Sequence, residues 1–238
     1  MSAKFSLEEN VAKKAPKAGT IPAIERFFRK LDIHAQENTL DSLFDLLNAL
    51  HSMNDKMNGE YRANLFDIPE FLIMKALRNY YQHQDEVGSE IRFFHHDEAP
   101  IISSLMTMCL IERTSLRKAV EAEDIKGDRD AKIEAMEKAL SWYGAVVDIN
   151  PCLFNLGVHV CMKVENLGID DSLTDETFTE FYGGYVSDKN SGVNIFVDQG
   201  FSTSIGAMGK VLKDLFGIEA QGNRPDVELA SGGKDEEK

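Results

Sequence analysis

The stretch DIPEFLIMKALRNYYQH, residues 67–83, carries the clearest fold signal in the sequence. Asp67 is a favoured N-cap residue, Pro69 suits the first helical turn, and Glu70 complements the positive end of the helix dipole. Residues 71–77 are almost entirely apolar, which is typical of a helix that packs into a core. The sequence therefore predicts a helix over residues 67–83 that ends in a polar segment.

The same helical spacing of apolar residues extends to both sides of this stretch. Further helices are predicted over residues 22–31, 39–53, 99–123, 127–147, 150–167, 172–185 and 202–216. The long, apolar segment 99–123 is the best candidate for the centre of the fold. These patterns predict an all-α fold, a multi-helix bundle of about seven or eight helices.

One segment has a strand-like pattern instead. YVSDKNSGVNIFV, residues 185–197, has a turn-rich middle between two β-favouring ends. This arrangement predicts a short β-hairpin near 185–197.

Composition divides the chain into three parts. Residues 1–20 are rich in Lys and Ala and predict a flexible N-terminal arm, whereas 219–238 predict a disordered acidic tail. Between them, 21–218 are predicted to form a single α-helical domain. The polar, glycine-containing stretch 123–129 leaves an interior boundary open as an alternative.

The charge balance restricts the partners. The chain has 238 residues, with 26 Lys+Arg against 40 Asp+Glu and a net charge of −14. Such a chain is not a general polyanion binder, because phosphate contacts need positive charge. A nucleic-acid role therefore requires a local basic site. Alternatively, the acidic surface meets a basic partner protein.

The number of cysteines and the hydropathy of the chain indicate in which cellular compartment the protein is expected. Three cysteines, Cys109, Cys152 and Cys161, make an odd count in a chain of this length, so no disulfide framework is expected. The sequence shows no signal-peptide pattern and no apolar run long enough to cross a bilayer. We therefore expect a cytoplasmic protein with reduced thiols and no membrane partner.

Metal and nucleophile motifs are weak. His95, His96 and the two following carboxylates are adjacent in sequence, and such neighbours rarely converge on one ion. Cys152, His159 and Cys161 are spaced so that only the first two share a helix face. A metal enzyme built around His95 and His96 stays a third hypothesis, and no metal or other cofactor is predicted. No Gly-x-Ser-x-Gly elbow or phosphate-binding loop is present.

The polar end of the 67–83 helix is the best candidate for chemistry. Asn79 and His83 are one turn apart and share a face, while Arg78 lies about 140° from His83 around the helix axis. A histidine titrates near neutral pH and can move the proton of a ribose 2′-OH, and a guanidinium stabilises extra charge on phosphorus. These residue types match RNA cleavage without metal.

Arg78-Asn79-x-x-x-His83 resembles the Arg-x4–6-His motif of the HEPN superfamily, a group of helical-bundle ribonucleases and toxins. The resemblance implies that Arg78 binds phosphate, that His83 is the acid–base residue and that Asn79 supports them. It also implies an RNA substrate, a homodimer that joins two motifs, and a toxin or antiviral-defence role. A second match, Arg29-x4-His34, has Lys30 where the family favours a polar amide, and is interpreted as accidental.

Neighbouring residues complete the predicted site. Lys75 and Arg92 supply cations for substrate binding, and Tyr81 is a candidate for stacking on a base. Some toxin members carry a His-x-Tyr extension, but here Gln84 and Asp85 follow His83, so that form of antitoxin control is not supported. An antitoxin or a basic protein remains an expected partner. The alternative function is a non-catalytic, acidic helical interaction or regulatory protein.

Overall fold

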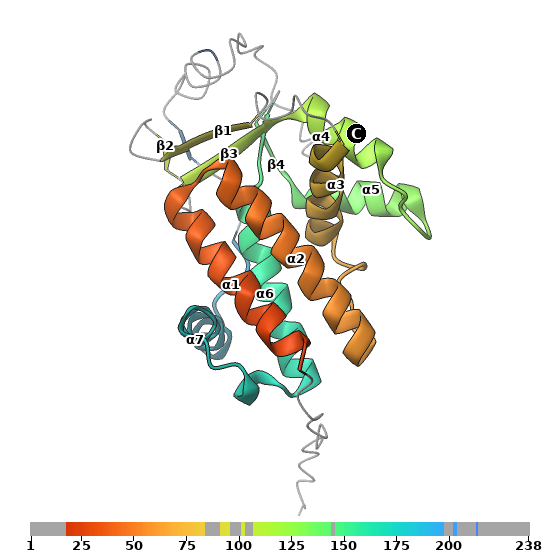
Figure 1. Ribbon diagram of the computed structural model, residues 1–238. Helices are drawn as coiled ribbons and strands as arrows, with labels where there is room; N and C mark the ends of the chain where they lie inside the picture. Colours follow the sequence, from red (N-terminus) through yellow and green to blue (C-terminus); the bar gives the residue numbers. More distant parts are fainter. Residues whose placement is uncertain are drawn as a thin grey trace, which may run out of the picture.

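The computed structural model describes residues 18–83, 91–95, 101–102, 107–143, 146–197, 202–203 and 213. The chain is mostly helical, as predicted, and forms a multi-helix bundle (Figure 1). The described residues contain seven α-helices: α1 (Thr20–Glu37), α2 (Leu40–Tyr61), α3 (Pro69–His83), α4 (Arg113–Ala122), α5 (Arg129–Ala139), α6 (Asn150–Leu167) and α7 (Glu176–Ser191).

The turn between α1 and α2 shows how local sequence sets the bundle. Asn38 ends α1 in the left-handed conformation, with φ 47°, which Asn tolerates better than most residues. Thr39 then caps α2: its hydroxyl accepts from the Ser42 amide at 3.2 Å, and the Ser42 hydroxyl accepts from the Thr39 amide at 3.1 Å. This tight connection lets α2 pack along α1 (Figure 1).

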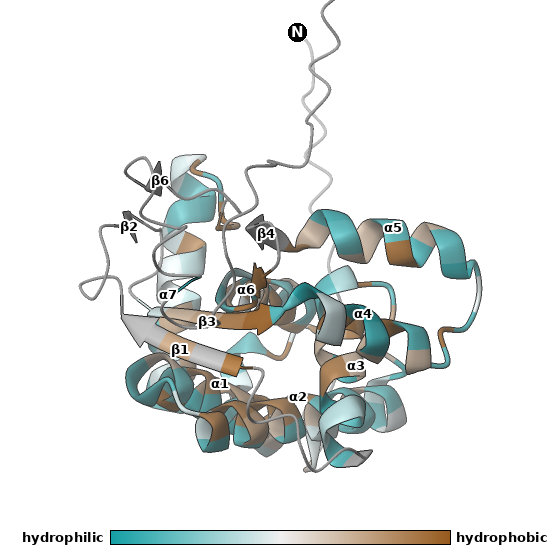
Figure 2. Cartoon of the chain, turned by 90° about the horizontal axis from the view of Figure 1, so that it is seen from above, coloured by the Kyte–Doolittle hydropathy of each residue, from teal (hydrophilic) through white to brown (hydrophobic). Residues whose placement is uncertain are grey.

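A four-stranded antiparallel sheet lies over one end of the bundle (Figures 1 and 2). Its order is β1-β3-β5-β4, with every neighbouring pair antiparallel. The strands are β1 (Ile91–His95), β3 (Thr107–Glu112), β4 (Ser141–Tyr143) and β5 (Val146–Asp148). Seen from above, β3 lies across α6, and the two elements are in contact (Figure 2).

Two predicted helices are therefore wrong in part. Residues 107–112 of the 99–123 segment form β3, and α4 begins only at Arg113. All four residues from Met108 to Ile111 are buried, so both faces of this strand are covered. A short apolar run of this kind has the same appearance in a buried strand and in a buried helix. Likewise, the 127–147 segment ends its helix at Ala139 and continues as β4 and β5.

The hairpin predicted near 185–197 is also wrong in its position. Helix α7 continues to Ser191, and Gly192 ends it with φ 69°. Residues 193–197 follow without strand structure. The small two-strand pairing in the described residues joins β2 (Ile101–Ile102) to β6 (Ser202–Thr203), so the 202–216 segment does not begin as a helix.

The predicted N-terminal arm overlaps the fold slightly, because α1 begins at Thr20, which is fully buried. Residues 1–17 and the predicted tail, 219–238, lie outside the described residues. The buried apolar side chains of all seven helices form one cluster that also includes Ile125 in the polar 123–129 stretch. Of the described helices, none is long and apolar enough to cross a membrane.

Gly157 lets α6 approach α1 and α7 closely. A Cβ at this position would lie 2.6 Å from Cζ of Phe181 and 3.2 Å from Cδ2 of Leu31. We expect Gly157→Ala to lower the free energy of unfolding by about 1–3 kcal/mol through overpacking, despite the better helix propensity of alanine. Urea unfolding measures this change.

Gly183 in α7 is the matched control for that substitution. No atom lies within 4 Å of a Cβ built there, so Gly183→Ala is expected to stabilise the chain by about 0.5–1 kcal/mol. Equal stabilisation by both substitutions would show that α6 does not need a glycine at 157.

Candidate functional site

Arg78 lies in the seam between α2 and α3 and is half-buried. Its Nε donates to Oδ1 of Asn48 in α2 at 3.2 Å, and its Nη1 donates to Oδ1 of Asn79 at 3.2 Å. Gln82 Nε2 also donates to Asn48 Oδ1, at 3.4 Å. Within the described residues the guanidinium is thus positioned by neutral amide oxygens, and no carboxylate neutralises its charge.

Glu123, directly after α4, organises the other side of the seam and is only 8% exposed. Its Oε2 accepts from Asn79 Nδ2 at 2.8 Å, and its Oε1 pairs with the Lys75 ammonium. Burial lowers the pKa of Lys75, as do the nearby charges of Lys126 and Arg78, while Asp124 opposes them. Lys75 and Asn79 therefore share one buried carboxylate that fixes both side chains.

His51 of α2, three residues after the Asn48 that bonds Arg78, is a further titratable group whose pKa the charge of Arg78 affects. Its Nδ1 lies 3.3 Å from Oδ2 of Asp55, one turn further along the helix. Burial lowers the pKa of His51 from its ordinary value of 6.5; Asp55 raises it, and the charges of Arg78 and Lys75 lower it. The ring is therefore mostly neutral at pH 7. With its Nδ1–H directed at Asp55, its Nε2 carries the lone pair of a base.

Sequence reasoning missed His51. The residue lies in the segment 39–53, which was interpreted only as a core helix. The signal available was its spacing of four residues from Asp55, which places a carboxylate beside an imidazole on one helix face. Nothing in the sequence shows that this face meets Arg78, because α2 and α3 come together only through packing.

The structure brings some predicted site residues together and not others. Arg78 and Asn79 are in contact, and Lys75 joins them through Glu123. Helix α3 continues without a break to His83, its last residue, so Asn79 and His83 share a face as the sequence predicts. The side chains of His83 and Arg92, which lies in β1, are outside the described part of the structure.

Tyr81 does not present a face for stacking on a base. It is 8% exposed and packs edge-on against Phe44 and Tyr80, with ring centroids 5.4 and 6.0 Å away. Its position follows from the helix, because Tyr81 projects from α3 toward the core together with Leu77. The substrate-binding role predicted for Tyr81 is therefore corrected to core packing.

The residues of the second Arg-x4-His match and of the Cys/His segment make contacts that stabilise the fold. Arg29 forms an ion pair with Asp175 at the start of α7, whereas His34 is buried beside Ser42, so the second Arg-x4-His match does not converge. Cys152 and Cys161 are buried thiols, and His159 Nε2 lies 3.6 Å from Glu70. Among the described residues, no three His, Cys, Asp or Glu side chains gather in a metal-binding group. His95 is described only as a residue of β1, and His96 lies outside the described residues.

The chain was compared with known proteins at three levels. No protein-family model matches it, and no curated protein and no solved structure is significantly similar.

Proposed function

We propose that this chain is a metal-independent endoribonuclease of the HEPN type. The observation that supports it is the half-buried Arg78, which is held by the amides of Asn48 and Asn79 and has no carboxylate partner among the described residues. On α2, one turn from the Asn48 that bonds Arg78, His51 is oriented by Asp55, and burial together with the charge of Arg78 lowers its pKa. A fixed cation and an oriented base at one seam are the two groups that RNA self-cleavage chemistry needs.

The proposed reaction is an attack of the ribose 2′-oxygen on the adjacent phosphorus. His51 Nε2 accepts the 2′-OH proton, and the new P–O2′ bond forms as the P–O5′ bond breaks. His83, assigned by the motif, donates a proton to the departing 5′-oxygen. The products are a 2′,3′-cyclic phosphate and a 5′-OH, so no water or metal is consumed.

Positive charge in the seam serves the transition state of this reaction. The attacked phosphate gains negative charge, and Arg78 offers donors that Asn48 and Asn79 do not use. Lys75 lies in the same seam, where its ammonium is paired with the Glu123 carboxylate, so Arg78 carries the positive charge that this pairing does not offset. In this assignment Asn79 positions the guanidinium, where the sequence alone suggested only a supporting role.

This local cation cluster also accounts for how a chain with a net charge of −14 engages RNA. Lys75 and Arg78 are close enough to each other and to His51 to influence pKa values. RNA contact is therefore confined to the seam, because acidic residues over the rest of the surface repel phosphate. Membership of the HEPN type carries with it the proposals of a homodimer, a toxin or antiviral role, and an antitoxin or basic protein partner.

A second candidate function has its own supporting observation. The Glu123 carboxylate after α4 bonds both Lys75 and Asn79 of α3, so the polar groups of all three side chains have partners. A network with a purely structural role requires the same pairing. A non-catalytic interaction or regulatory protein would use these residues only to hold its helices together. The two candidates differ in whether RNA is cut.

The test is RNA cleavage by the purified chain in the presence of EDTA. We expect cleavage of single-stranded or loop RNA to continue in EDTA and to leave 2′,3′-cyclic phosphate ends, detected by end-specific labelling and mass spectrometry. His83→Ala is expected to lower the rate by about 10²–10⁴-fold. Intact RNA at high protein concentration, with no difference between the wild type and this variant, would favour the interaction protein.

A further inference from the structure

A pocket of about 420 Å³ opens between α1, α6 and α7, on elements other than the α2–α3 seam. Its volume lies within the range of small-molecule sites. Phe28 from α1, Phe154 from α6 and Phe181 from α7 supply three aromatic walls. Contacts between the helices hold these walls in place, so the pocket is a fixed feature of the helical bundle.

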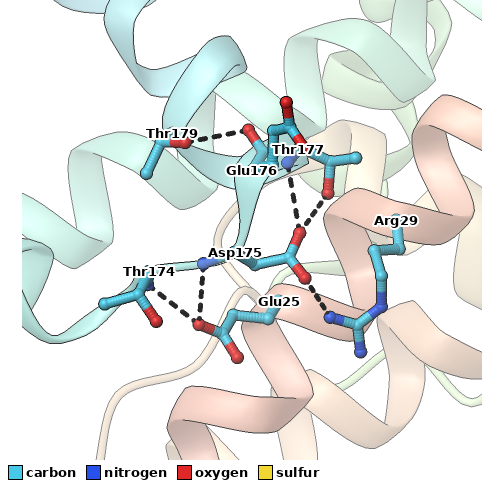
Figure 3. Close-up of polar contacts among 7 residues, drawn as sticks. All are labelled: Glu25, Arg29, Thr174, Asp175, Glu176, Thr177 and Thr179. Atoms are coloured by element: carbon cyan, nitrogen blue, oxygen red, sulfur yellow. Dashed lines mark hydrogen bonds and ion pairs between the residues drawn. The ribbon is translucent and has the colours of Figure 1, made fainter.

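The contact between α7 and α1 fixes the outer wall of the pocket (Figure 3). Glu25 of α1 accepts from the backbone amides of Thr174 and Asp175 at 3.0 and 3.1 Å. Asp175 in turn pairs with Arg29 and caps α7 through Thr177, whose amide lies 3.2 Å away. Because Thr177 lines the pocket, this network sets the distance between the two helices at the opening.

Two buried polar residues that line the pocket, His34 and Asn150, each have a side-chain atom without a hydrogen-bond partner in the described structure. Asn150 Nδ2 donates to the backbone oxygen of Thr107 at 3.0 Å, which fixes its amide and leaves Oδ1 directed elsewhere. The Ser42 hydroxyl donates to the Thr39 carbonyl at 2.9 Å. His34 Nδ1 lies 2.8 Å from the Ser42 hydroxyl oxygen.

Both residues are deeply buried: Asn150 is 7% exposed and His34 is 2% exposed. Burial lowers the pKa of His34 to about 4, and the side chain of Asn150 opposes this shift. Asn150 Oδ1, an acceptor, has no hydrogen-bond partner within 3.5 Å in the described structure. A donor group of a ligand, such as an ammonium, would compensate this buried oxygen.

The opening of the pocket is acidic as well. Asp32 from α1 and Glu180 from α7 line it. The Asp32 carboxylate accepts from the neutral Gln36 amide at 2.8 Å, and no Lys or Arg of the described residues forms an ion pair with Asp32 or Glu180. Aromatic faces attract cations too. The aromatic walls and the acidic opening therefore both favour positive charge.

We propose that this pocket binds a small organic cation with an apolar body, of the aryl-alkyl amine class. The apolar part packs among the three phenylalanines, and the ammonium group lies toward Asp32 and Glu180. Phosphate- or carboxylate-bearing ligands are excluded by the same charges. This site is separate from the ribonuclease seam and does not depend on that function.

Three ligands that share an indole ring test the proposal by calorimetry at pH 7: tryptamine, neutral tryptophol and anionic indole-3-acetate. We expect tryptamine to bind about tenfold more tightly than tryptophol, and indole-3-acetate not to bind. Asp32→Asn and Glu180→Gln are surface changes that keep side-chain size, and each is expected to weaken tryptamine about two- to fivefold while leaving tryptophol unchanged.

Ala35→Trp locates the binding, because Ala35 is exposed and lines the pocket. Its indole would fill the space and weaken both tryptamine and tryptophol. Equal affinity for all three ligands, binding of none, or tryptamine binding that survives Asp32→Asn, Glu180→Gln and Ala35→Trp would each overturn the proposal.

Discussion

Arg78→Ala is expected to reduce RNA cleavage by about 10²–10³-fold, because the variant loses the fixed charge that stabilises the pentavalent phosphorus. His51→Ala is expected to cost about 10²–10⁴-fold through the loss of the base. Single-turnover cleavage of a labelled RNA in EDTA measures both. The effect of Arg78→Ala on the free energy of unfolding should stay near 1 kcal/mol, since the residue is half-buried and gives up hydrogen bonds to amides only.

Arg26→Ala is the matched control, because Arg26 is exposed on α1 and belongs to neither site. Its cleavage rate should equal that of the wild type. Arg78→Lys keeps the charge but not the planar fork that fits two amides and a phosphate, so an intermediate rate is expected. If Arg78→Ala cuts RNA as fast as Arg26→Ala does, the proposed phosphate site is wrong.

His51 provides a readout that does not depend on activity. The charge of Arg78 lowers the pKa of His51, so Arg78→Ala should raise that pKa toward the ordinary value of 6.5. Asp55 acts in the opposite direction, and Asp55→Asn should lower the pKa further. Imidazole resonances followed by NMR titration report both shifts. An unmoved His51 titration in Arg78→Ala would mean that the two side chains are not neighbours in solution.

Asp148→Asn is expected to make the chain more stable at pH 7 and above, by about 4 kcal/mol relative to the wild type. Asp148 is fully buried, and burial raises its pKa from 3.8 to about 7 against the opposing hydrogen bonds from the amides of Asn150 and Cys109. The folded chain therefore favours the neutral acid. That preference contributes stability below pH 3.8 and is lost as the pH rises toward 7.

Asparagine imitates the neutral acid at every pH. Its Oδ1 can accept from the amides of Cys109 and Asn150, which lie 3.1 Å from Asp148 Oδ1. The second polar atom has no partner in either form, since Asp148 Oδ2 is already unbonded in the described structure. Urea unfolding at pH 4 should give nearly equal free energies of unfolding for the wild type and Asp148→Asn. At pH 8 the variant should have a clearly larger free energy of unfolding. The exposed Asp188→Asn is the control and should show no such difference; a constant difference at both pH values would contradict the assignment.

His34 changes the stability of the fold with pH in the opposite direction to Asp148, and so masks part of the pH dependence that Asp148 causes. Its folded-state pKa of about 4 lies below 6.5, so the stability it contributes is complete above pH 6.5 and is lost as the pH falls toward 4. Asp148 loses stability as the pH rises across the same window. In the wild type the two effects of pH on the free energy of unfolding offset each other. In Asp148→Asn only the His34 effect remains, so the stability of this variant should fall as the pH drops from 6.5 toward 4.

Much of the helical architecture follows from local sequence. Thr39 and Ser42 form the capping box of α2, Asp175 caps α7, and Gly168 and Gly192 end α6 and α7 in the left-handed conformation. These signals act within a few residues, so a sequence shows them directly. Apolar spacing also identifies which face of α1, α2 and α3 is buried.

The sheet could not be predicted in the same way. Met108 to Ile111 are all buried, and strands from distant parts of the chain pair with both edges of β3, with Ile111 opposite Ile91 and Val147. Such a run has no alternation to separate it from a helix. The strand identity is therefore decided by pairing, which depends on residues about 20 and 36 positions away.

The sequence by itself determined the helical class, several helix caps and the placement of Arg78, Asn79 and His83 on one helix, because each depends on neighbours along the chain. Only the tertiary structure decided that Asn48, His51 and Glu123 surround that motif, and that Tyr81 belongs to the core. It also decided that His34 and Asn150 meet beneath a pocket. The physical reason is that charge compensation, burial and pKa depend on distances in space between helices that the sequence separates.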